Sequence, residues 1–343
     1  MIERLFIKLI AALPEGIFDL LYLYRHVKID DQTLNSKARF LCDIDRKTAV
    51  SVRDTPVETT RANLERLAGV MAGPRPRLKK IENLEIPSET GSIPVRLYKP
   101  TEEPSLPVLL YYHGGGYIRG SLDSHDVLCA RLAKYGGFAV LSVGYRLAPE
   151  AKFPAAVDDS LTAYLWIRSH ASEYGLDADR IAVGGDSSGG CLAAVTAQQI
   201  KTLRHPLPVF QLLLYPTMDA HLSAESHQLF ADGFFLSNER IRDYRDMYLN
   251  NATERDDNRA SPLLNPDLAG LPPALIVSAG FDPLRDEAEA YGKALQAAGV
   301  NVGAVRFPGM VHGFMSLTAM LPQADKALSQ AAEALKHTFD PRG

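Results

Sequence analysis

The chain has 343 residues, of which 46% are hydrophobic and 23% are charged, and its formal net charge is −4. This composition is that of an ordinary globular protein, and the length allows one extended α/β domain with an insertion, or two domains. No basic stripe accompanies the slightly acidic charge, so nucleic acid is excluded as an expected partner.

The three cysteines give no sign of a metal site or of a disulfide framework. Cys42, Cys129 and Cys191 are far apart, odd in number, and lack the paired spacing of zinc ligands. We expect them to be buried thiols of a protein in a reducing compartment, which predicts a cytoplasmic location and no metal.

Two apolar stripes at helical spacing lie at the N-terminus. The first comprises Ile2, Leu5, Phe6, Leu9 and Leu13, and the second comprises Ile17, Leu20, Leu21 and Tyr24. Charged residues and Pro14 interrupt the run, so we predict two amphipathic helices that cover another part of the protein, and not an export signal. Helices lying on a membrane surface are the alternative, but no stretch is long and apolar enough to span a bilayer.

The segment from Ser51 to Pro87 is charged, and within it the pattern predicts only a short helix over residues 61–69. The sequence Gly73-Pro-Arg-Pro then breaks the chain. Strands are predicted over Asn83–Ser88 and Ile93–Tyr98, joined as a hairpin at a sheet edge.

Apolar runs and helical segments alternate through the rest of the chain. Strands are predicted over Leu106–His113, Phe138–Tyr145, Val209–Tyr215, Ala274–Ser278 and Val302–Phe307, and helices over Asp126–Tyr135, Ala155–Ser169, Gly189–Leu203, Arg285–Ala298 and Asp325–Thr338. Continuous apolar runs are typical of strands buried on both faces of a parallel sheet. The alternation predicts an α/β fold with a mostly parallel central sheet flanked by helices, and a site at the carboxyl ends of its strands.

One interval breaks this alternation. Between Pro216 and Leu271 the chain has no core strand for more than fifty residues, yet its apolar residues keep helical spacing. A structureless loop of that length is unusual in a compact domain, so we predict a helical insertion. Together with the N-terminal helices, the insertion could form a cap over the carboxyl end of the sheet.

The segment from Ile181 to Gly190 predicts a strand, a sharp turn and a helix. Within it, Gly185-Asp-Ser-Ser-Gly189 fits G-x-S-x-G, the nucleophile elbow, in which small neighbours allow a strained backbone to expose a serine. Only Ser187 stands at the central position, because the same pattern centred on Ser188 would need a glycine at position 186. Ser187 is therefore the predicted nucleophile.

A serine nucleophile needs a histidine base and an orienting carboxylate, and in this chain order the acid precedes the histidine. Asp282 follows the strand at residues 274–278 and precedes Pro283, which favours Asp282 as the acid. Asp286 is the alternative, although the dipole of the following helix explains an acid there. His312, in a glycine-flanked loop after the last strand, is the predicted base.

Acyl transfer also needs hydrogen-bond donors for the oxyanion. The residue after the nucleophile, Ser188, supplies one backbone amide. The glycines after His113 supply the others, and we assign Gly115 and Gly116 as donors. His113 precedes Ser187 and is interpreted as a side chain that holds this loop.

These motifs together resemble the bacterial hormone-sensitive-lipase-like (family IV) esterases. The resemblance rests on His113-Gly-Gly-Gly116, Tyr145-Arg-Leu-Ala-Pro-Glu150, Gly185-Asp-Ser-Ser-Gly-Gly190, Asp282-Pro-Leu-Arg-Asp-Glu287 and His312-Gly-Phe314 and covers roughly residues 80–320. Ser188 departs from the pattern, because members of that family usually have alanine after the nucleophile. The oxyanion donor is a backbone amide, so we expect little loss from this change.

The resemblance implies an α/β-hydrolase fold and a cofactor-free serine carboxylesterase for short- to medium-chain acyl esters. It divides the chain into cap helices and linker (1–60), a catalytic domain (61–216 and 271–343) and a helical cap insertion (217–270). A small-molecule ester is the expected partner, and similar enzymes often form a homodimer. An amidase or deacetylase with the same triad, or a non-catalytic small-molecule receptor on the same fold, are the alternatives.

Overall fold

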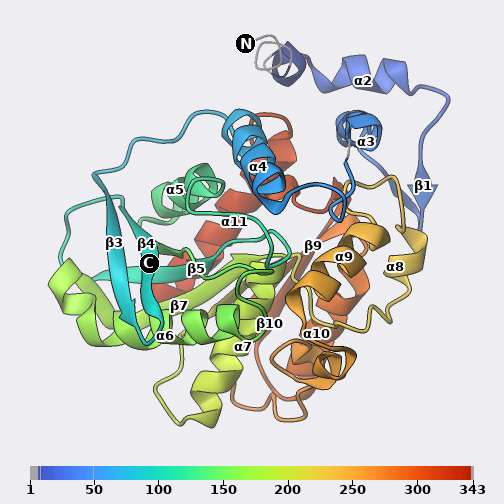
Figure 1. The fold of residues 1–343 in the computed structure, drawn as a ribbon. Helices are drawn as coiled ribbons and strands as arrows, with labels where there is room; N and C mark the ends of the chain where they lie inside the picture. Colours follow the sequence, from blue (N-terminus) through green and yellow to red (C-terminus); the bar gives the residue numbers. More distant parts are fainter. Residues whose placement is uncertain (1–6, 8, 49, 341–343) are drawn as a thin grey trace.

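The structure, a computed structural model, describes residues 7, 9–48 and 50–340. An eight-stranded sheet runs through its centre in the order β10-β9-β8-β7-β5-β6-β4-β3 (Figure 1). Neighbours from β10 to β6 are parallel, whereas the β6–β4 and β4–β3 pairs are antiparallel. The predicted mostly parallel sheet with a hairpin at its edge is confirmed. The strands of this sheet are β3 (Lys80–Ser88), β4 (Gly91–Lys99), β5 (Leu106–Tyr112), β6 (Ala139–Val143), β7 (Leu176–Asp186), β8 (Gln211–Leu214), β9 (Ala274–Phe281) and β10 (Val302–Val311).

Helices cover both faces of the sheet and create two hydrophobic cores. On one face, α5 (Asp126–Gly136) packs against α11 (Pro322–Phe339). On the other face, α6 (Ala155–His170) packs against α7 (Ser188–Thr202), and α10 (Arg285–Ala297) packs against β9. All residues of β6, β8 and β9 are buried, which explains why their sequences are apolar without alternation. The three cysteines are buried free thiols.

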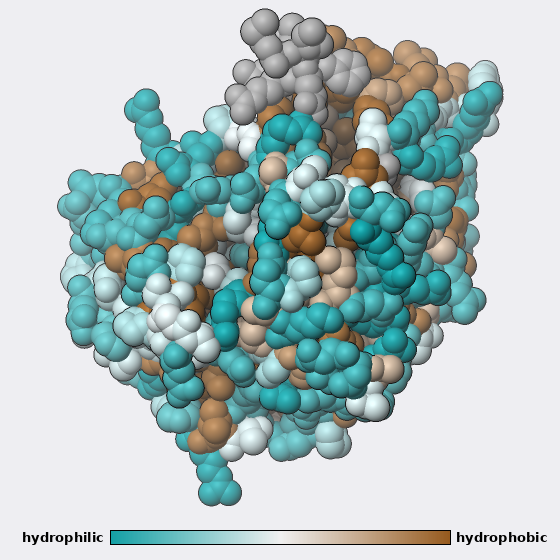
Figure 2. All heavy atoms as spheres, in the orientation of Figure 1, coloured by the Kyte–Doolittle hydropathy of each residue, from teal (hydrophilic) through white to brown (hydrophobic). Residues whose placement is uncertain are grey.

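The predicted second N-terminal helix is present, but the face expected to be buried is wrong. Helix α2 (Glu15–Leu21) buries Phe18, whose ring lies 5.1 Å from that of Phe40, centroid to centroid. The predicted stripe faces outward, with Leu20 71% and Tyr24 93% exposed. The helix turns a different face inward because Phe18 is the large side chain that finds a partner. The outward face of α2 forms an apolar patch in the upper part of Figure 2.

The first stripe is only partly described, because Ile2, Leu5 and Phe6 lie outside the described residues. Residues 9–12 are helical, as predicted, but Leu9 is exposed while Ile10 is buried. Within residues 7, 9–48 and 50–340, no helix has the length and hydrophobicity needed to cross a bilayer.

The segment between the N-terminus and the sheet holds more helix than predicted. Helix α3 (Ser36–Thr48) has no counterpart in the sequence interpretation, and α4 (Val57–Met71) extends the short helix expected at residues 61–69 in both directions. A small two-stranded sheet, β1 (Lys28–Ile29) with β2 (Gln32–Thr33), precedes α3. Helix α4 starts before the predicted domain boundary at residue 60, and the division into domains stays a prediction.

The interval from 217 to 270 is helical, in short pieces. It contains α8 (Ser226–Leu229), α9 (Asn238–Tyr248) and the 3₁₀ turns η2 (Ala252–Asp256) and η3 (Pro262–Leu264). Ser237 caps α9 by accepting a hydrogen bond from the Arg240 amide. In Figure 1, α4 and α9 flank the region into which the central strands point their carboxyl ends.

Candidate active site

Ser187 occupies a strained turn between β7 and α7. Its φ of 55° and ψ of −121° lie outside the regions that a non-glycine residue ordinarily adopts. The glycines on either side are required by space, because a Cβ at Gly185 would overlap the backbone of Gly189, and one at Gly189 would overlap the carbonyl oxygen of Tyr112. The turn therefore has the geometry that the G-x-S-x-G pattern predicts.

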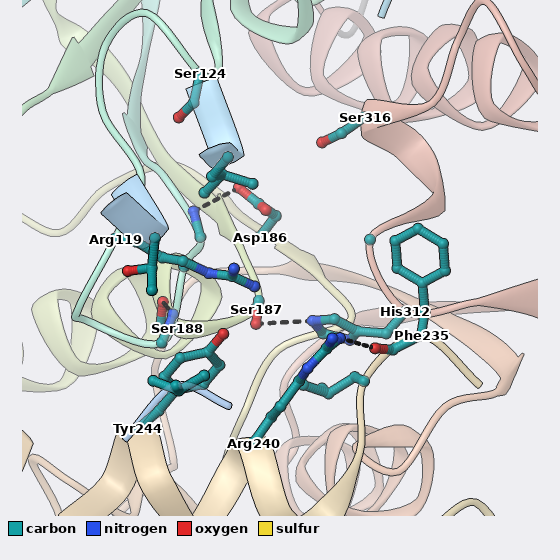
Figure 3. A pocket seen from close by; sticks show the side chains of 18 of the residues that line it. Arg119, Ser124, Asp186, Ser187, Ser188, Phe235, Arg240, Tyr244, His312 and Ser316 are labelled. Atoms are coloured by element: carbon teal, nitrogen blue, oxygen red, sulfur yellow. Dashed lines mark hydrogen bonds between the residues drawn. The ribbon is translucent and has the colours of Figure 1, made fainter. Parts of the chain in front are cut away.

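A continuous hydrogen-bonded chain joins Ser187, His312 and Asp282. The Ser187 Oγ lies 2.9 Å from His312 Nε2 (Figure 3). On the other side of the ring, His312 Nδ1 lies 2.8 Å from Asp282 Oδ2. Asp282 follows β9 and is completely buried, and its Oδ1 accepts a hydrogen bond from the Leu284 amide. The loop after β10 brings His312 from the neighbouring strand, since β9 and β10 are paired in parallel. The structure thus brings all three residues together.

The alternative acid, Asp286, lies outside this chain. Its carboxylate pairs with the neighbouring Arg285 guanidinium at 2.7 Å and accepts a hydrogen bond from the Ser226 amide at 2.9 Å. Burial raises the pKa of Asp286, but Arg285 and the Ser226 amide outweigh burial, so the net pKa is lowered. This residue connects α10 to α8 and has a structural explanation.

The predicted oxyanion residues meet beside Ser187. The amide of Gly116 donates a hydrogen bond of 3.0 Å to the Ser188 hydroxyl. The amides of Gly115 and Ser188 have no acceptor among the described residues, and Ser188 begins α7, where helical amides lack partners. The Ser188 hydroxyl, which the sequence left without a defined role, thus contacts the Gly116 amide and is fully buried.

Asp186, the residue before the nucleophile, was missed as a structural residue by the sequence analysis. Its Oδ1 accepts hydrogen bonds from the Gly114 amide at 2.9 Å and the Tyr111 hydroxyl at 2.8 Å, and His125 Nε2 lies 3.2 Å from its Oδ2. Burial alone would raise the pKa of Asp186, but the charge and hydrogen bond of His125 and the Tyr111 hydroxyl lower it on balance. An ionisable residue at the end of a buried strand was the available signal, because such a group needs partners.

His113 holds the glycine loop, as interpreted from the sequence. Its Nδ1 lies 2.9 Å from the Gly114 carbonyl oxygen, and its ring stacks on Tyr145 at 4.3 Å between centroids. Burial, together with the nearby His125, lowers the pKa of His113 to about 3. The ring is therefore neutral at physiological pH.

A cavity of about 600 Å³ opens above Ser187 and His312. Its lining comes from the N-terminal segment, α3, α4, α9 and the loops at the carboxyl ends of the strands. Apolar lining residues include Ile7, Ile10, Leu41, Leu64, Leu67, Phe235, Ile241 and Leu317. The volume is in the range of small-molecule sites, which lie mostly in apolar clefts with a few polar groups. Within the described part of the chain, no three His, Cys, Asp or Glu side chains are grouped to hold a metal ion.

Comparison with known proteins agrees with the fold. The profile of a family described as having the alpha/beta hydrolase fold matches residues 109–316. The carboxylic ester hydrolase LipN of Mycobacterium tuberculosis is 40% identical over 319 residues, which are 91% of this chain and 85% of LipN. The ethyl acetate hydrolase of Pseudomonas putida is 39% identical, over 81% of this chain and 89% of that protein.

Solved structures give the same result. An ester hydrolase from the metagenome of Lake Arreo, complexed with a bipyridine phosphonate derivative, aligns with a TM-score of 0.86 and 38% identity over 89% of this chain and 99% of its own. A hyperthermophilic esterase of Pyrobaculum calidifontis aligns with a TM-score of 0.84 and 36% identity over 88% of this chain and 98% of its own. The chain belongs to the α/β-hydrolase family, in its hormone-sensitive-lipase-like (family IV) branch. It is a carboxylic ester hydrolase.

Proposed function

We propose that this chain hydrolyses short- to medium-chain acyl esters through a Ser187-His312-Asp282 triad and an acyl-enzyme intermediate. The observation that supports the proposal most directly is the unbroken hydrogen-bonded chain from Ser187 Oγ through both nitrogens of His312 to Asp282. This is the arrangement that a serine nucleophile requires, because its proton must pass to a base as the oxygen attacks.

Each member of the triad has one role in this mechanism. Asp282 accepts a hydrogen bond from the Nδ1–H of His312, which keeps the proton on Nδ1 and leaves Nε2 unprotonated and facing Ser187. As the Ser187 oxygen attacks the ester carbonyl, its proton moves to Nε2, and Asp282 stabilises the imidazolium. His312 then gives that proton to the leaving alcohol, and the acyl group stays on Ser187. Water attacks the acyl-enzyme by the same route and releases the acid.

The negative charge of the tetrahedral intermediate falls on the former carbonyl oxygen. The amides of Gly115 and Ser188, which have no acceptor in the described structure, are the proposed first donors. The Gly116 amide is the third proposed donor, and it must share or exchange its bond to the Ser188 hydroxyl to bind the oxyanion. His113 and Asp186 keep the glycine loop in place from its buried side.

The cap determines which acyl groups fit. We assign residues 1–60 and 217–270 to the cap and residues 61–216 and 271–343 to the catalytic domain, because side chains from the first two segments line the cavity above Ser187. A mostly apolar cavity of about 600 Å³ suits an aliphatic acyl chain of short to medium length.

One experiment tests both the triad and the acyl range. The wild type and Ser187→Ala are compared on 4-nitrophenyl esters from acetate to hexadecanoate, with thermal melting as the control for folding. We expect the highest kcat/KM between butanoate and octanoate, and a loss of at least about 10⁴-fold in Ser187→Ala at an unchanged Tm. Retained activity in the folded variant would overturn the triad. A maximum at hexadecanoate would overturn the acyl range alone.

A further inference from the structure

The cavity above Ser187 is richer in positive charge than the protein as a whole. Four arginines and two aspartates are among the described residues that line it, although the chain has a net charge of −4. These residues are Arg66, Arg119, Arg240, Arg245, Asp45 and Asp186. Charge of one sign in a concave site raises the local concentration of ligands of opposite charge. A lining arginine that no partner already neutralises would therefore attract an anionic group on the substrate.

Three of the four arginines already have partners. Arg240 lies 3.0 Å from Asp45, Arg245 lies 2.9 Å from Asp246, and Arg66 also has an interaction. Arg119 differs from them, because its side chain forms no hydrogen bond or ion pair with another described residue, and its buried Nε is left unsatisfied. A buried donor on a charged group is costly without an acceptor. The guanidinium of Arg119 thus lacks the carboxylate partner that Arg240 and Arg245 have.

Arg119 is held close to the reacting groups. Its backbone amide donates to the carbonyl oxygen of Gly115 at 3.1 Å, so it is fixed to the predicted oxyanion loop. Its guanidinium lies 5.2 Å from the ring centroid of Tyr244, whose buried hydroxyl also has no partner. Figure 3 shows the polar ends of Arg119 and Tyr244 turned toward Ser187. The side chains that carry these two unsatisfied donors therefore turn toward Ser187.

We infer that Arg119 binds a carboxylate of the substrate, so that this enzyme prefers esters that carry a free carboxylate over neutral esters of the same size. The inference rests on the proposed role of Ser187. A planar guanidinium can donate two parallel hydrogen bonds to a carboxylate, and such charge-assisted bonds are strong in a site shielded from water. Tyr244 supports the guanidinium with its ring and offers its hydroxyl as a further donor. Arg119 is thus a specificity-determining residue.

The test compares matched esters in the wild type and in Arg119→Gln. On the acyl side, the pair is 4-nitrophenyl hydrogen adipate and 4-nitrophenyl hexanoate. On the alcohol side, it is 4-acetoxybenzoate and 4-methylphenyl acetate. Each ester's kcat/KM in the variant is divided by its kcat/KM in the wild type, so the intrinsic reactivity of the ester cancels before the two members of a pair are compared. We expect Arg119→Gln to lower kcat/KM for the carboxylated member of at least one pair by about 10- to 100-fold, mainly through KM, and to leave both neutral esters within about threefold.

Two further variants separate recognition from structure. Arg245→Gln removes the same charge from the cavity lining at an arginine that already has Asp246 as partner, and we expect no change in either ratio. Arg119→Lys keeps the charge without the planar fork, and we expect it to retain part of the preference.

The outcomes distinguish this inference from the proposed function. An equal loss for charged and neutral esters, or no loss in either pair, would overturn the role of Arg119, and so would an equal effect of Arg245→Gln. If wild type and Ser187→Ala hydrolyse the neutral esters equally, the proposed triad fails first. If Arg119→Gln does not fold, Arg119→Lys is used in its place. A lower ratio of kcat/KM for the carboxylated ester to kcat/KM for its neutral partner would support the inference. An unchanged ratio, together with an unchanged salt dependence of KM for the adipate ester, would overturn it.

Discussion

Replacement of Ser188 by alanine tests how the proposed oxyanion donors are arranged. In the structure, the Ser188 hydroxyl is fully buried and accepts a 3.0 Å hydrogen bond from the Gly116 amide. Alanine is the residue that similar esterases usually have at this position, so the backbone of α7 should tolerate it. The substitution removes one acceptor and leaves the Gly116 amide with no partner until an oxyanion forms.

The expected magnitude follows from what Gly116 gains in the transition state. In the proposed mechanism, the wild-type Gly116 amide exchanges its neutral hydrogen bond to Ser188 for one to an anion, whereas in Ser188→Ala it forms the bond to the anion anew. Only interactions that strengthen in the transition state accelerate the reaction. A neutral hydrogen bond contributes about 0.5–1.5 kcal/mol, so kcat should rise by about 2- to 10-fold. The free energy of unfolding should fall by about 1 kcal/mol, because the buried amide loses its acceptor.

The assay is steady-state hydrolysis of 4-nitrophenyl butanoate, with denaturant unfolding to measure stability. Burst kinetics would show whether acylation is the step that changes. A fall in kcat of more than tenfold in a variant that folds would refute the reasoning, because it would mean that the Ser188 hydroxyl positions the Gly116 amide and does not compete for it. Ser188→Thr, which keeps the hydroxyl, is the matched control and should restore the wild-type kcat if its methyl group fits.

Two further predictions concern the acids beside Ser187. Asp282→Asn should lower kcat by about 10³- to 10⁴-fold at an unchanged Tm, because an amide that donates to His312 Nδ1 favours the tautomer that cannot accept the Ser187 proton. Steady-state kinetics and a melting curve measure the two quantities, and a loss in kcat below tenfold would contradict the prediction. Asp186→Asn should reduce the free energy of unfolding by about 2–3 kcal/mol at neutral pH, since three donors lose a charged acceptor. The pKa of Asp186 is lowered by folding, so its contribution is present above the unfolded value of about 4 and is lost as pH falls through the folded pKa. Urea titrations should therefore show that the difference in the free energy of unfolding between the wild type and Asp186→Asn becomes smaller below about pH 4. A difference that stays constant with pH would argue against a lowered pKa of Asp186.

The catalytic half of the molecule was predictable because its signals are local and strong. The strands that carry Asp282 and His312 are continuous apolar runs, and parallel pairing brings their carboxyl ends to the same edge. The turn at Ser187 needs glycine on both sides for steric reasons, which leaves a recognisable pattern. Order along the chain then selected Asp282 and His312 as the predicted acid and base without any information about distance, and the structure places both in a hydrogen-bonded chain with Ser187.

The cap was less predictable because several side chains on one helix can provide its inward face. The stripe of Ile17, Leu20, Leu21 and Tyr24 has good helical spacing, yet α2 turns Phe18 inward. The choice depends on Phe40 in α3, a helix for which the sequence analysis made no prediction. Periodicity shows that a helix is amphipathic, but the partner helix decides which side chains become buried.

The side chains whose roles could not be predicted from the sequence have a common property. Neither the fold nor the triad requires a particular residue type at their positions. In the proposed mechanism, Ser188 needs only to supply a backbone amide, so its side chain is free to vary. In this chain the Ser188 hydroxyl accepts a hydrogen bond from the Gly116 amide. Arg119 follows the glycine loop at a position where the backbone is fixed but the side chain enters the cavity. Catalysis requires particular residue types at fixed positions, and these form a recognisable motif. Binding of one substrate requires only that a side chain complement that substrate, so it leaves no motif in the sequence. Substrate choice should therefore be sought at positions such as 119, where an unsatisfied donor in the folded protein indicates the chemistry of the missing ligand.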